Sequence, residues 1–104
     1  MDAEVSHEDG LTVVVTRNDE RSRYEGHVGD DLVGVISFSV SEQMMTITHT
    51  GTEPAWRERG IAARLTTAAL DDVRAQGMSV NPVCPYTGQF IAQHAEYADL
   101  LTHD

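Results

Sequence analysis

The first half of the chain is dominated by short segments in which apolar and polar residues alternate. Apolar side chains at every second position are typical of strands that bury one face of a sheet. Polar turns separate these segments, so we expect an antiparallel meander of four strands. The predicted strands cover residues 11–17, 21–28, 32–40 and 44–50. On the fourth strand, we expect Met45, Ile47 and His49 to share a face.

Beyond residue 60 the apolar residues recur once per helical turn, as in an amphipathic helix. They stand at Ile61, Leu65, Ala69 and Val73. Gly77 follows as a natural stop, because glycine readily adopts the left-handed conformation that ends a helix. The spacing therefore predicts one long helix over residues 60–76.

Shorter elements are expected after this helix. Residues 78–83 predict a strand, and Pro82 marks it as an edge or a distortion, because proline cannot donate to a strand ladder. Residues 85–94 predict a short helix, and residues 96–101 a last short element. The helix between the fourth and fifth strands favours a parallel pairing of the two. The predicted order is ββββαβα, an α/β fold (α+β in some schemes) with an antiparallel four-strand meander, a helix, a parallel fifth strand and a short C-terminal helix.

The length and composition indicate one small domain. The chain has 104 residues, of which 40% are hydrophobic. We interpret residues 1–10 as a flexible acidic leader and residues 11–104 as the domain. The chain has no apolar run near the roughly 20 residues that a membrane span needs, and no signal peptide is recognisable. We therefore expect a cytoplasmic protein without a membrane partner.

Charge and residue usage exclude several classes of function. The net charge is −10, which argues against nucleic acid as a partner. The sequence contains seven arginines and no lysine, so Schiff-base chemistry and a Walker-type phosphate loop are excluded. Cys84 is the single cysteine, which rules out a disulfide within the chain and disfavours a cysteine-based zinc site. We predict no metal.

Three of the seven arginines stand close together at the start of the long helix. Arg57, Arg59 and Arg64 lie within eight residues, with Gly60 between them. A helix start offers unpaired N–H groups and partial positive charge, and glycine lets an anion approach the backbone. The segment indicates a phosphate site; the alternative is a solvated helix face.

The same segment resembles the acetyl-CoA-binding signature of the GCN5-related N-acetyltransferases, Gln/Arg-x-x-Gly-x-Gly/Ala. Arg57, Gly60 and Ala62 stand at its specified positions. The meander before it and the strand and helix after it match the element order of that fold. His49-Thr50 and Cys84-Pro85-Tyr86 are similar to a compact subgroup of very short, YjdJ-type members. The resemblance extends from about residue 12 to residue 101.

The resemblance implies a sheet whose fourth and fifth strands separate at one end. The pantetheine arm of coenzyme A would enter that gap, and the pyrophosphate would rest on the helix start. The implied cofactor residues, acting largely through their main-chain N–H groups, are Arg57, Arg59, Gly60, Ile61 and Ala62. Arg64, one turn further on, would reach a phosphate at the adenosine end.

Acetyl transfer to an amine requires a base for the amine proton. His49 is one candidate, because an imidazole exchanges protons near neutral pH; the alternative is a half-buried structural histidine. Glu53 is a second candidate, acting through a water, and the alternative is an exposed turn carboxylate. The subgroup commonly has a glutamate where this chain has Gly51.

The leaving thiolate requires an acid, and a two-step route requires a nucleophile. Cys84, at the end of the fifth strand, could accept the acetyl group as a thiolate; alternatively it is a small buried apolar residue. Tyr97 or Tyr86 could protonate the thiolate of coenzyme A, or each could be a packing residue. Phe90 stands where the subgroup often has an aromatic hydroxyl.

From these observations we expect an N-acetyltransferase that uses acetyl-CoA and acts on an unidentified amine of a small molecule or peptide. One alternative is a binding module for acyl-CoA that has lost turnover. Another is an anion-binding protein for a different nucleotide. The expected partners are acetyl-CoA and the amine acceptor, and the chain is either a monomer or a homodimer.

Overall fold

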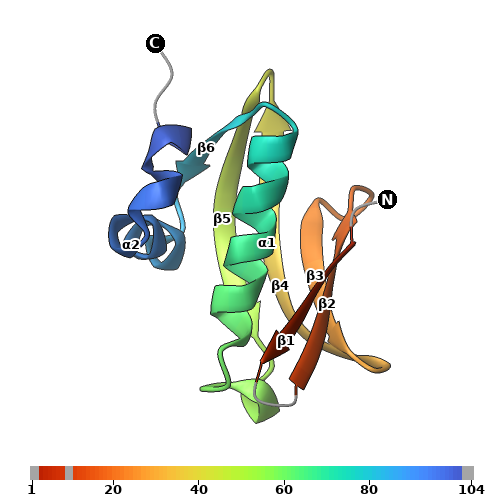
Figure 1. Ribbon diagram of the computed structural model, residues 1–104. Coiled ribbons are helices and arrows are strands. Elements are labelled where there is room, and N and C mark those ends of the chain that lie inside the picture. The colour runs from red at the N-terminus through yellow and green to blue at the C-terminus, as the bar shows by residue number, and fades with distance from the viewer. Residues whose placement is uncertain (1–2, 9–10, 102–104) are drawn as a thin grey trace.

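The computed structural model describes residues 3–8 and 11–101 and contains one six-stranded sheet (Figure 1). Its strands lie in chain order from β1 to β6. All neighbours are antiparallel except β5 and β6, which are parallel. The strands are β1 (Ala3–Glu8), β2 (Leu11–Asn18), β3 (Arg23–Val28), β4 (Asp31–Ser41), β5 (Met44–Thr52) and β6 (Ser79–Pro82).

The helices follow β5, which corresponds to the fourth strand of the predicted meander. A short 3₁₀ turn, η1 (Pro54–Trp56), leads into α1 (Ile61–Ala75), which connects β5 to β6. Gly77 has a φ of 70°, and its N–H donates to the Arg74 carbonyl oxygen, so the predicted glycine stop is confirmed. α2 (Pro85–Gln93) and a second 3₁₀ helix, η2 (Ala95–Leu100), complete the order. The predicted meander, crossover helix and parallel last strand are thus confirmed.

The interpretation of residues 1–10 as a flexible leader needs correction. Residues Ala3–Glu8 form β1, which pairs antiparallel with β2 along its whole length. An edge strand needs no strict apolar alternation, so this segment lacks the pattern that reveals a buried strand. Its backbone pairs with the donors and acceptors that β2 would otherwise present to solvent. Residues 1, 2, 9 and 10 lie outside the described part of the chain.

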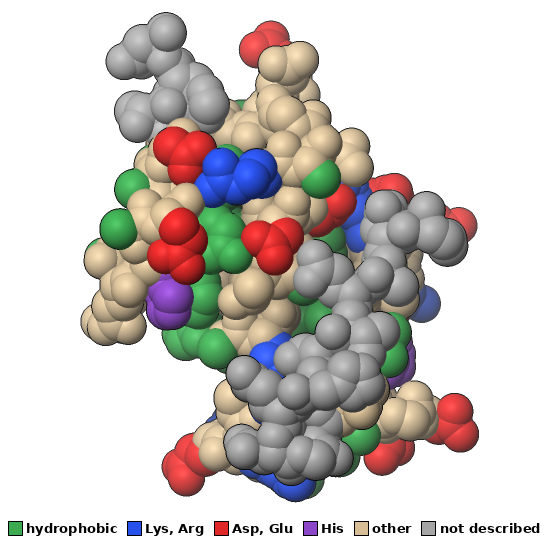
Figure 2. Space-filling model, in the orientation of Figure 1, with side chains coloured by type: hydrophobic (Ala, Val, Ile, Leu, Met, Phe, Trp, Pro, Cys, Tyr) green, Lys and Arg blue, Asp and Glu red, His purple; other side chains and the backbone are tan. Residues whose placement is uncertain are grey.

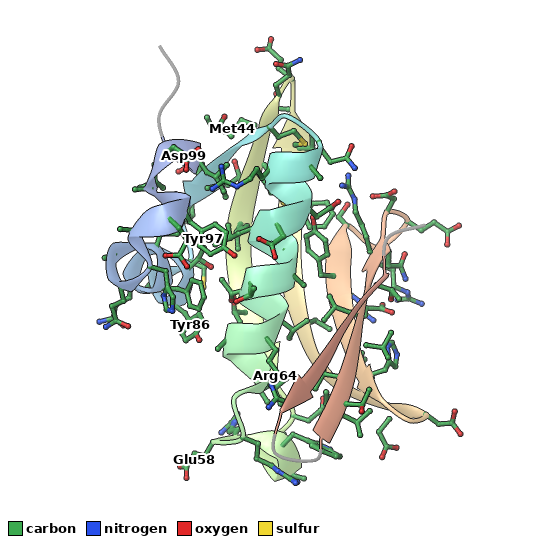
Figure 3. All side chains as sticks on the ribbon, in the orientation of Figure 1. Met44, Glu58, Arg64, Tyr86, Tyr97 and Asp99 are labelled. Carbon is green, nitrogen blue, oxygen red and sulfur yellow. The ribbon has the colours of Figure 1, made fainter. Side chains whose placement is uncertain are left out.

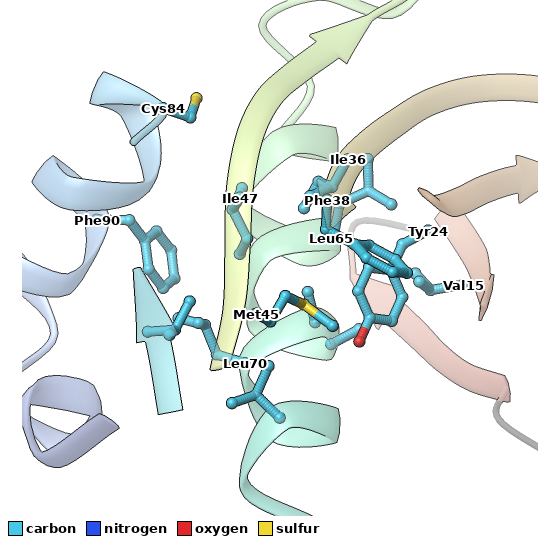
Figure 4. Close-up of a cluster of buried hydrophobic side chains, with 14 of the residues drawn as sticks. Val15, Tyr24, Ile36, Phe38, Met45, Ile47, Leu65, Leu70, Cys84 and Phe90 are labelled. Atoms are coloured by element: carbon cyan, nitrogen blue, oxygen red, sulfur yellow. The ribbon is translucent and has the colours of Figure 1, made fainter. Parts of the chain in front are cut away.

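The core lies between α1 and one face of the sheet (Figure 4). Leu65 of α1 is fully buried and lies over two glycines of neighbouring strands. A Cβ atom added at Gly26 would come within 3.1 Å of the Leu65 side chain, and one added at Gly34 within 2.8 Å. The missing side chains let the first half of α1 approach β3 and β4 closely. This approach sets the position of the helix start relative to β5.

Two polar contact sets fasten α1 to its neighbours. On the sheet side, Asp72 accepts hydrogen bonds from Arg17 at 2.9 Å and from the Tyr24 hydroxyl at 2.6 Å. On the other side, Arg74 forms an ion pair with Asp99 of η2 at 2.8 Å. The second contact ties the C-terminal segment to α1 and thereby holds α2 beside β6.

Acidic side chains are spread over the visible surface rather than gathered in one patch, in keeping with the net charge of −10 (Figure 2). Within residues 3–8 and 11–101, no helix combines the length and apolar character that crossing a bilayer requires.

Candidate active site

β5 is paired with β6 only along its first half. The parallel register ends with Ile47 opposite Pro82, and the Cys84 N–H donates to the Ile47 carbonyl oxygen at 2.9 Å. Beyond this point β5 continues to Thr52, whereas the chain after β6 turns into α2. The two segments therefore separate between the end of β5 and the start of α2, as the resemblance implies.

A cavity of about 240 Å³ lies at the start of α1 beside this separation. One wall comes from the end of β5, the loop before α1 and the first turn of α1; Tyr86 of α2 forms another part. The lining residues are Thr52, Trp56, Arg57, Glu58, Gly60, Ile61, Ala62, Ala63 and Tyr86. The small residues of the first helical turn leave the backbone within reach of a ligand.

The first turn of α1 presents backbone donors to this cavity. Gly60 is the N-cap residue with a φ of 77°, and as a glycine it has no side chain with which to cap the helix. The first donor bonded inside the helix is the Arg64 N–H, which contacts the Gly60 carbonyl oxygen at 3.2 Å. The N–H groups of Ile61, Ala62 and Ala63 precede this bond and lie at the positive end of the helix dipole. These N–H groups are the donors that the predicted anion site would use.

The loop before α1 carries two arginines, of which Arg57 lines the cavity and Arg59 does not. Arg57 Nε donates to the Thr52 carbonyl oxygen at 3.4 Å, which ties this residue to the end of β5. The Arg59 guanidinium lies over the Trp56 ring, 4.8 Å from its centroid. Glu58, between the two arginines, has a φ of 63° and extends away from the fold (Figure 3). A non-glycine residue in the left-handed region is strained, and such strain is often found where a loop binds a ligand.

Arg64 has a different environment from the other two arginines. Its side chain is 8% exposed, and the residue does not line the cavity at the helix start. The role suggested for it, direct contact with a phosphate, would require this side chain to move.

Cys84 lies directly across the separation from β5. Its Sγ atom is 3.6 Å from Thr50 Oγ1, and the residue is 6% exposed. Burial acts to raise the pKa of the Cys84 thiol, but hydrogen bonds with the Thr50 hydroxyl and the backbone N–H groups of Thr87 and Tyr86 outweigh it. The pKa therefore lies below its ordinary value, as expected for a cysteine at a helix start.

His49 does not share the face of Met45 and Ile47, and this prediction is corrected. Ile47 pairs with Phe38 but His49 pairs with Ser37, so Thr48 between them has no opposing residue. This β-bulge inserts one residue and inverts the alternation beyond it. His49 consequently lies on the face away from α1.

The same bulge brings Thr50 to the face that carries Cys84. Simple alternation would turn Thr50 away from that face, so sequence reasoning did not single it out as a site residue. A bulge has no dependable sequence signal, and only the pairing with β4 reveals it.

A second, larger cavity of about 570 Å³ lies along the beginning of β4 and the end of β5. It brings together both predicted base candidates, His49 and Glu53. Its lining residues are Leu32, Gly34, Val35, His49, Thr50, Gly51, Thr52, Glu53 and Arg57. Thr52 and Arg57 also line the smaller cavity, so the two cavities meet at the end of β5. Thr50 connects the larger cavity to Cys84 through its hydroxyl.

The two tyrosine candidates have different surroundings. The Tyr97 hydroxyl donates to Asp71 of α1 at 2.7 Å, and burial followed by this bond raises the pKa of Tyr97 to about 12. Tyr86 is 37% exposed and lines the smaller cavity, and burial raises the pKa of its hydroxyl. In Figure 3, Tyr86 extends from α2 beside α1. Tyr86 is therefore the tyrosine next to the helix start, whereas Tyr97 fastens η2 to α1.

Comparison with known proteins shows the family to which a chain with this geometry belongs. A family model described as GCN5-related N-acetyl-transferase matches residues 23–100, which contain the helix start, the separating strands and Cys84. The chain belongs to this family. The family generally uses acetyl-CoA, and its chemistry is acetyl transfer.

One similar solved structure shows the same fold over nearly the whole chain. It is the solution structure of a GCN5-like protein from Staphylococcus aureus, with a TM-score of 0.63 and 16% sequence identity. The match covers 99% of this chain and 91% of the other. No curated protein matches the chain.

Proposed function

We propose that this protein binds acetyl-CoA and transfers its acetyl group to an amine. The observation behind the proposal is the cavity that extends from the first turn of α1 to Thr52 at the end of β5 and Tyr86 of α2. Thr50 and Cys84, which contact each other, lie two residues before these last two lining residues. The pyrophosphate would accept hydrogen bonds from the first N–H groups of α1, from Ile61 onward, with Arg57 and Arg59 nearby. The pantetheine arm would run past Tyr86 toward Cys84.

The buried Arg64 adds positive charge near this end of α1 without lining the cavity. The segment Cys84-Pro85-Tyr86 is the basis on which we propose that the chain belongs to the short, YjdJ-type subgroup. We retain acetyl-CoA as the cofactor and predict no metal.

The acceptor amine would approach from the larger cavity. His49, or Glu53 through a water, takes the amine proton as the new N–C bond forms and the thioester C–S bond breaks. Glu53 and the net charge of −10 favour a cationic amine. Tyr86 gives its proton to the leaving thiolate of coenzyme A; the raised pKa keeps its hydroxyl protonated until then.

A two-step route is also compatible with the position of Cys84. The Cys84 thiolate would attack the acetyl carbonyl, the thioester bond to coenzyme A would break, and the new thioester would then acylate the amine. The lowered pKa of Cys84 and its 3.6 Å contact with Thr50 favour this alternative.

Isothermal titration with acetyl-CoA, coenzyme A and ATP tests the proposal. We expect acetyl-CoA and coenzyme A to bind, and ATP to bind far more weakly because it lacks pantetheine.

Arg59→Ala should weaken acetyl-CoA binding by about tenfold, which corresponds to about 1.4 kcal/mol. Arg21→Ala is the matched control, since it removes the same charge from an exposed turn. Absence of acetyl-CoA binding at high micromolar concentration would exclude the proposal.

Turnover is measured separately, by release of free thiol from acetyl-CoA across a panel of amines. Thiol release that depends on one class of amine supports the transferase. Tight binding with no release for any amine would identify a binding module without turnover.

A further inference from the structure

Gly51 occupies a position on β5 where its backbone does not require glycine. The described glycines with positive φ are Gly29, Gly60 and Gly77, and Gly51 is not among them. Glycine within a strand reduces stability because it has no side chain to pack, so its presence often reflects close approach of another group. Another group is therefore expected in the space that a side chain of residue 51 would fill.

The group that occupies this space is the imidazole of His49. A Cβ atom added at Gly51 would lie 2.9 Å from His49 Nε2, and 3.7 and 3.8 Å from the Cδ2 and Cε1 atoms of the ring. Real Cβ atoms do not approach other atoms as closely as 2.9 Å. The ring thus lies along the strand, over the site that a side chain of residue 51 would fill.

The bulge at Thr48 accounts for this arrangement. It places His49 on the face away from α1, and Gly51, two residues later, lies on the same face. The ring can lie along the strand, over residue 51, only because that residue has no side chain. Its Nε2 atom is then directed along β5, toward the part of the larger cavity that holds Glu53 and Arg57. These two residues are the carboxylate and the guanidinium that line that cavity.

We infer that Gly51 is a positioning residue for His49, holding its imidazole in the larger cavity as the base for the acceptor amine. The inference rests on the proposed acetyl transfer. A side chain at residue 51 would turn the ring off the strand and out of reach of an amine in the cavity. The backbone at residue 51 would tolerate alanine, since the atoms that must move are the end of an exposed side chain.

Gly51→Ala tests this directly, with Gly88→Ala as the matched control. At Gly88 the added Cβ would meet only the Pro82 carbonyl oxygen, at an ordinary 3.9 Å. We expect the NMR resonances of the His49 ring to shift in Gly51→Ala and to stay in place in Gly88→Ala, with the rings of His27 and His94 unchanged in both. His49 ring resonances that do not move in Gly51→Ala would refute the inference.

A double-mutant cycle connects the ring position to catalysis. We expect Gly51→Ala to lower kcat at least about tenfold and His49→Ala about a hundredfold, within the range for loss of a general base, with little change in acetyl-CoA affinity. The double variant His49→Ala/Gly51→Ala should be no slower than His49→Ala, because there is no ring left to displace. Losses that multiply in the double variant would show an effect of Gly51 independent of His49 and overturn the inference.

The two readouts separate this inference from the proposed function. The ring resonances are measured in the free protein and need neither acetyl-CoA nor turnover. A wild-type protein without acetyl-CoA binding would exclude the proposed function, while an unmoved His49 ring in Gly51→Ala would exclude the positioning role alone.

Discussion

At the scale of single residues, the proposed chemistry depends on which groups surround the separation of β5 from α2. Cys84 is buried there, within hydrogen-bonding distance of Thr50, while Tyr86 lines the neighbouring cavity. Two routes use these residues differently. A covalent route needs the Cys84 thiol as nucleophile. Direct transfer needs no nucleophile from the protein, but it needs the Tyr86 hydroxyl as acid beside the base for the amine proton.

Replacing Cys84 distinguishes the routes. If Cys84 carries the acetyl group, mass spectrometry after incubation with acetyl-CoA should show one added acetyl group on the wild type and none on Cys84→Ala, and kcat should fall by more than about a hundredfold. Thr50→Val should reduce the rate of acetylation, because it removes the hydroxyl that stabilises the thiolate. An unmodified Cys84 together with unchanged turnover in Cys84→Ala would leave direct transfer as the route.

Tyr86→Phe tests the acid. Loss of a proton donor to the leaving thiolate should lower kcat by about tenfold to a hundredfold, with little effect on acetyl-CoA affinity. Tyr97→Phe is the control, since the Tyr97 hydroxyl is bonded to Asp71. Equal losses of kcat in the two variants would contradict the assignment, and so would an unchanged kcat in Tyr86→Phe.

At the scale of secondary-structure elements, the site depends on how closely α1 approaches the sheet. Leu65 rests on Gly26 and Gly34, and this contact lies one turn from the helix start that presents the N–H groups. The bulge in β5 is a second feature of this scale. Because it inserts one residue, it turns His49 away from α1 and Thr50 toward it. Both features combine to place an anion site, a cysteine and a histidine around the end of one strand.

Gly34→Ala should displace α1. The added Cβ would lie 2.8 Å from the Leu65 side chain and 3.0 Å from the Gly51 carbonyl oxygen, which is a rigid neighbour. We expect the free energy of unfolding to fall by about 1–3 kcal/mol, as for overpacked cores, and acetyl-CoA affinity to fall with it. Urea denaturation and titration calorimetry measure the two effects.

A smaller residue at position 65 provides the control for Gly34→Ala. Leu65→Val, which makes room beneath the helix, should cost less in the Gly34→Ala background than in the wild type. Strictly additive losses would show that contact with Leu65 is not the cause.

At the scale of the whole molecule, the C-terminal segment and α1 are held together by a few polar contacts. The Tyr97 hydroxyl bonds to Asp71, and Arg74 bonds to Asp99 and to the Glu96 carbonyl oxygen. The Arg74 guanidinium also lies 5.8 Å from the centroid of the Tyr97 ring. Because α2 precedes η2, these contacts help to keep Tyr86 and Cys84 opposite β5.

The Tyr97 contact predicts a loss of stability in alkali. Burial and the bond to Asp71 raise the pKa of Tyr97 to about 12 in the folded protein, against about 10 in an unfolded chain. The folded state therefore favours the protonated hydroxyl, whose contribution is complete below about pH 10 and is lost as pH rises toward about 12. Urea unfolding between about pH 8 and pH 11 should show a steeper loss of stability in the wild type than in Tyr97→Phe. Parallel curves for the two proteins would contradict the prediction.

Much of the architecture was determined by the sequence itself. Alternation in the meander and a helical repeat after residue 60 are local properties, because each reflects which side of one element is buried. Gly77 and the glycine and arginines at the helix start act within a turn of their own positions. For the same reason the helix start at which we propose an anion site could be predicted from a short segment.

The tertiary structure decided what depends on pairing between distant segments. β1 became visible only through its pairing with β2, since this short segment contains few apolar residues and gives only a weak sequence pattern. The face on which His49 lies depends on its partner in β4, and the role of Tyr97 depends on Asp71 in a different helix. A sequence pattern reports the environment along one element, whereas register, bulges and contacts between elements arise from how several elements pack together. The groups proposed for proton transfer are therefore the ones that only the folded chain brought into place.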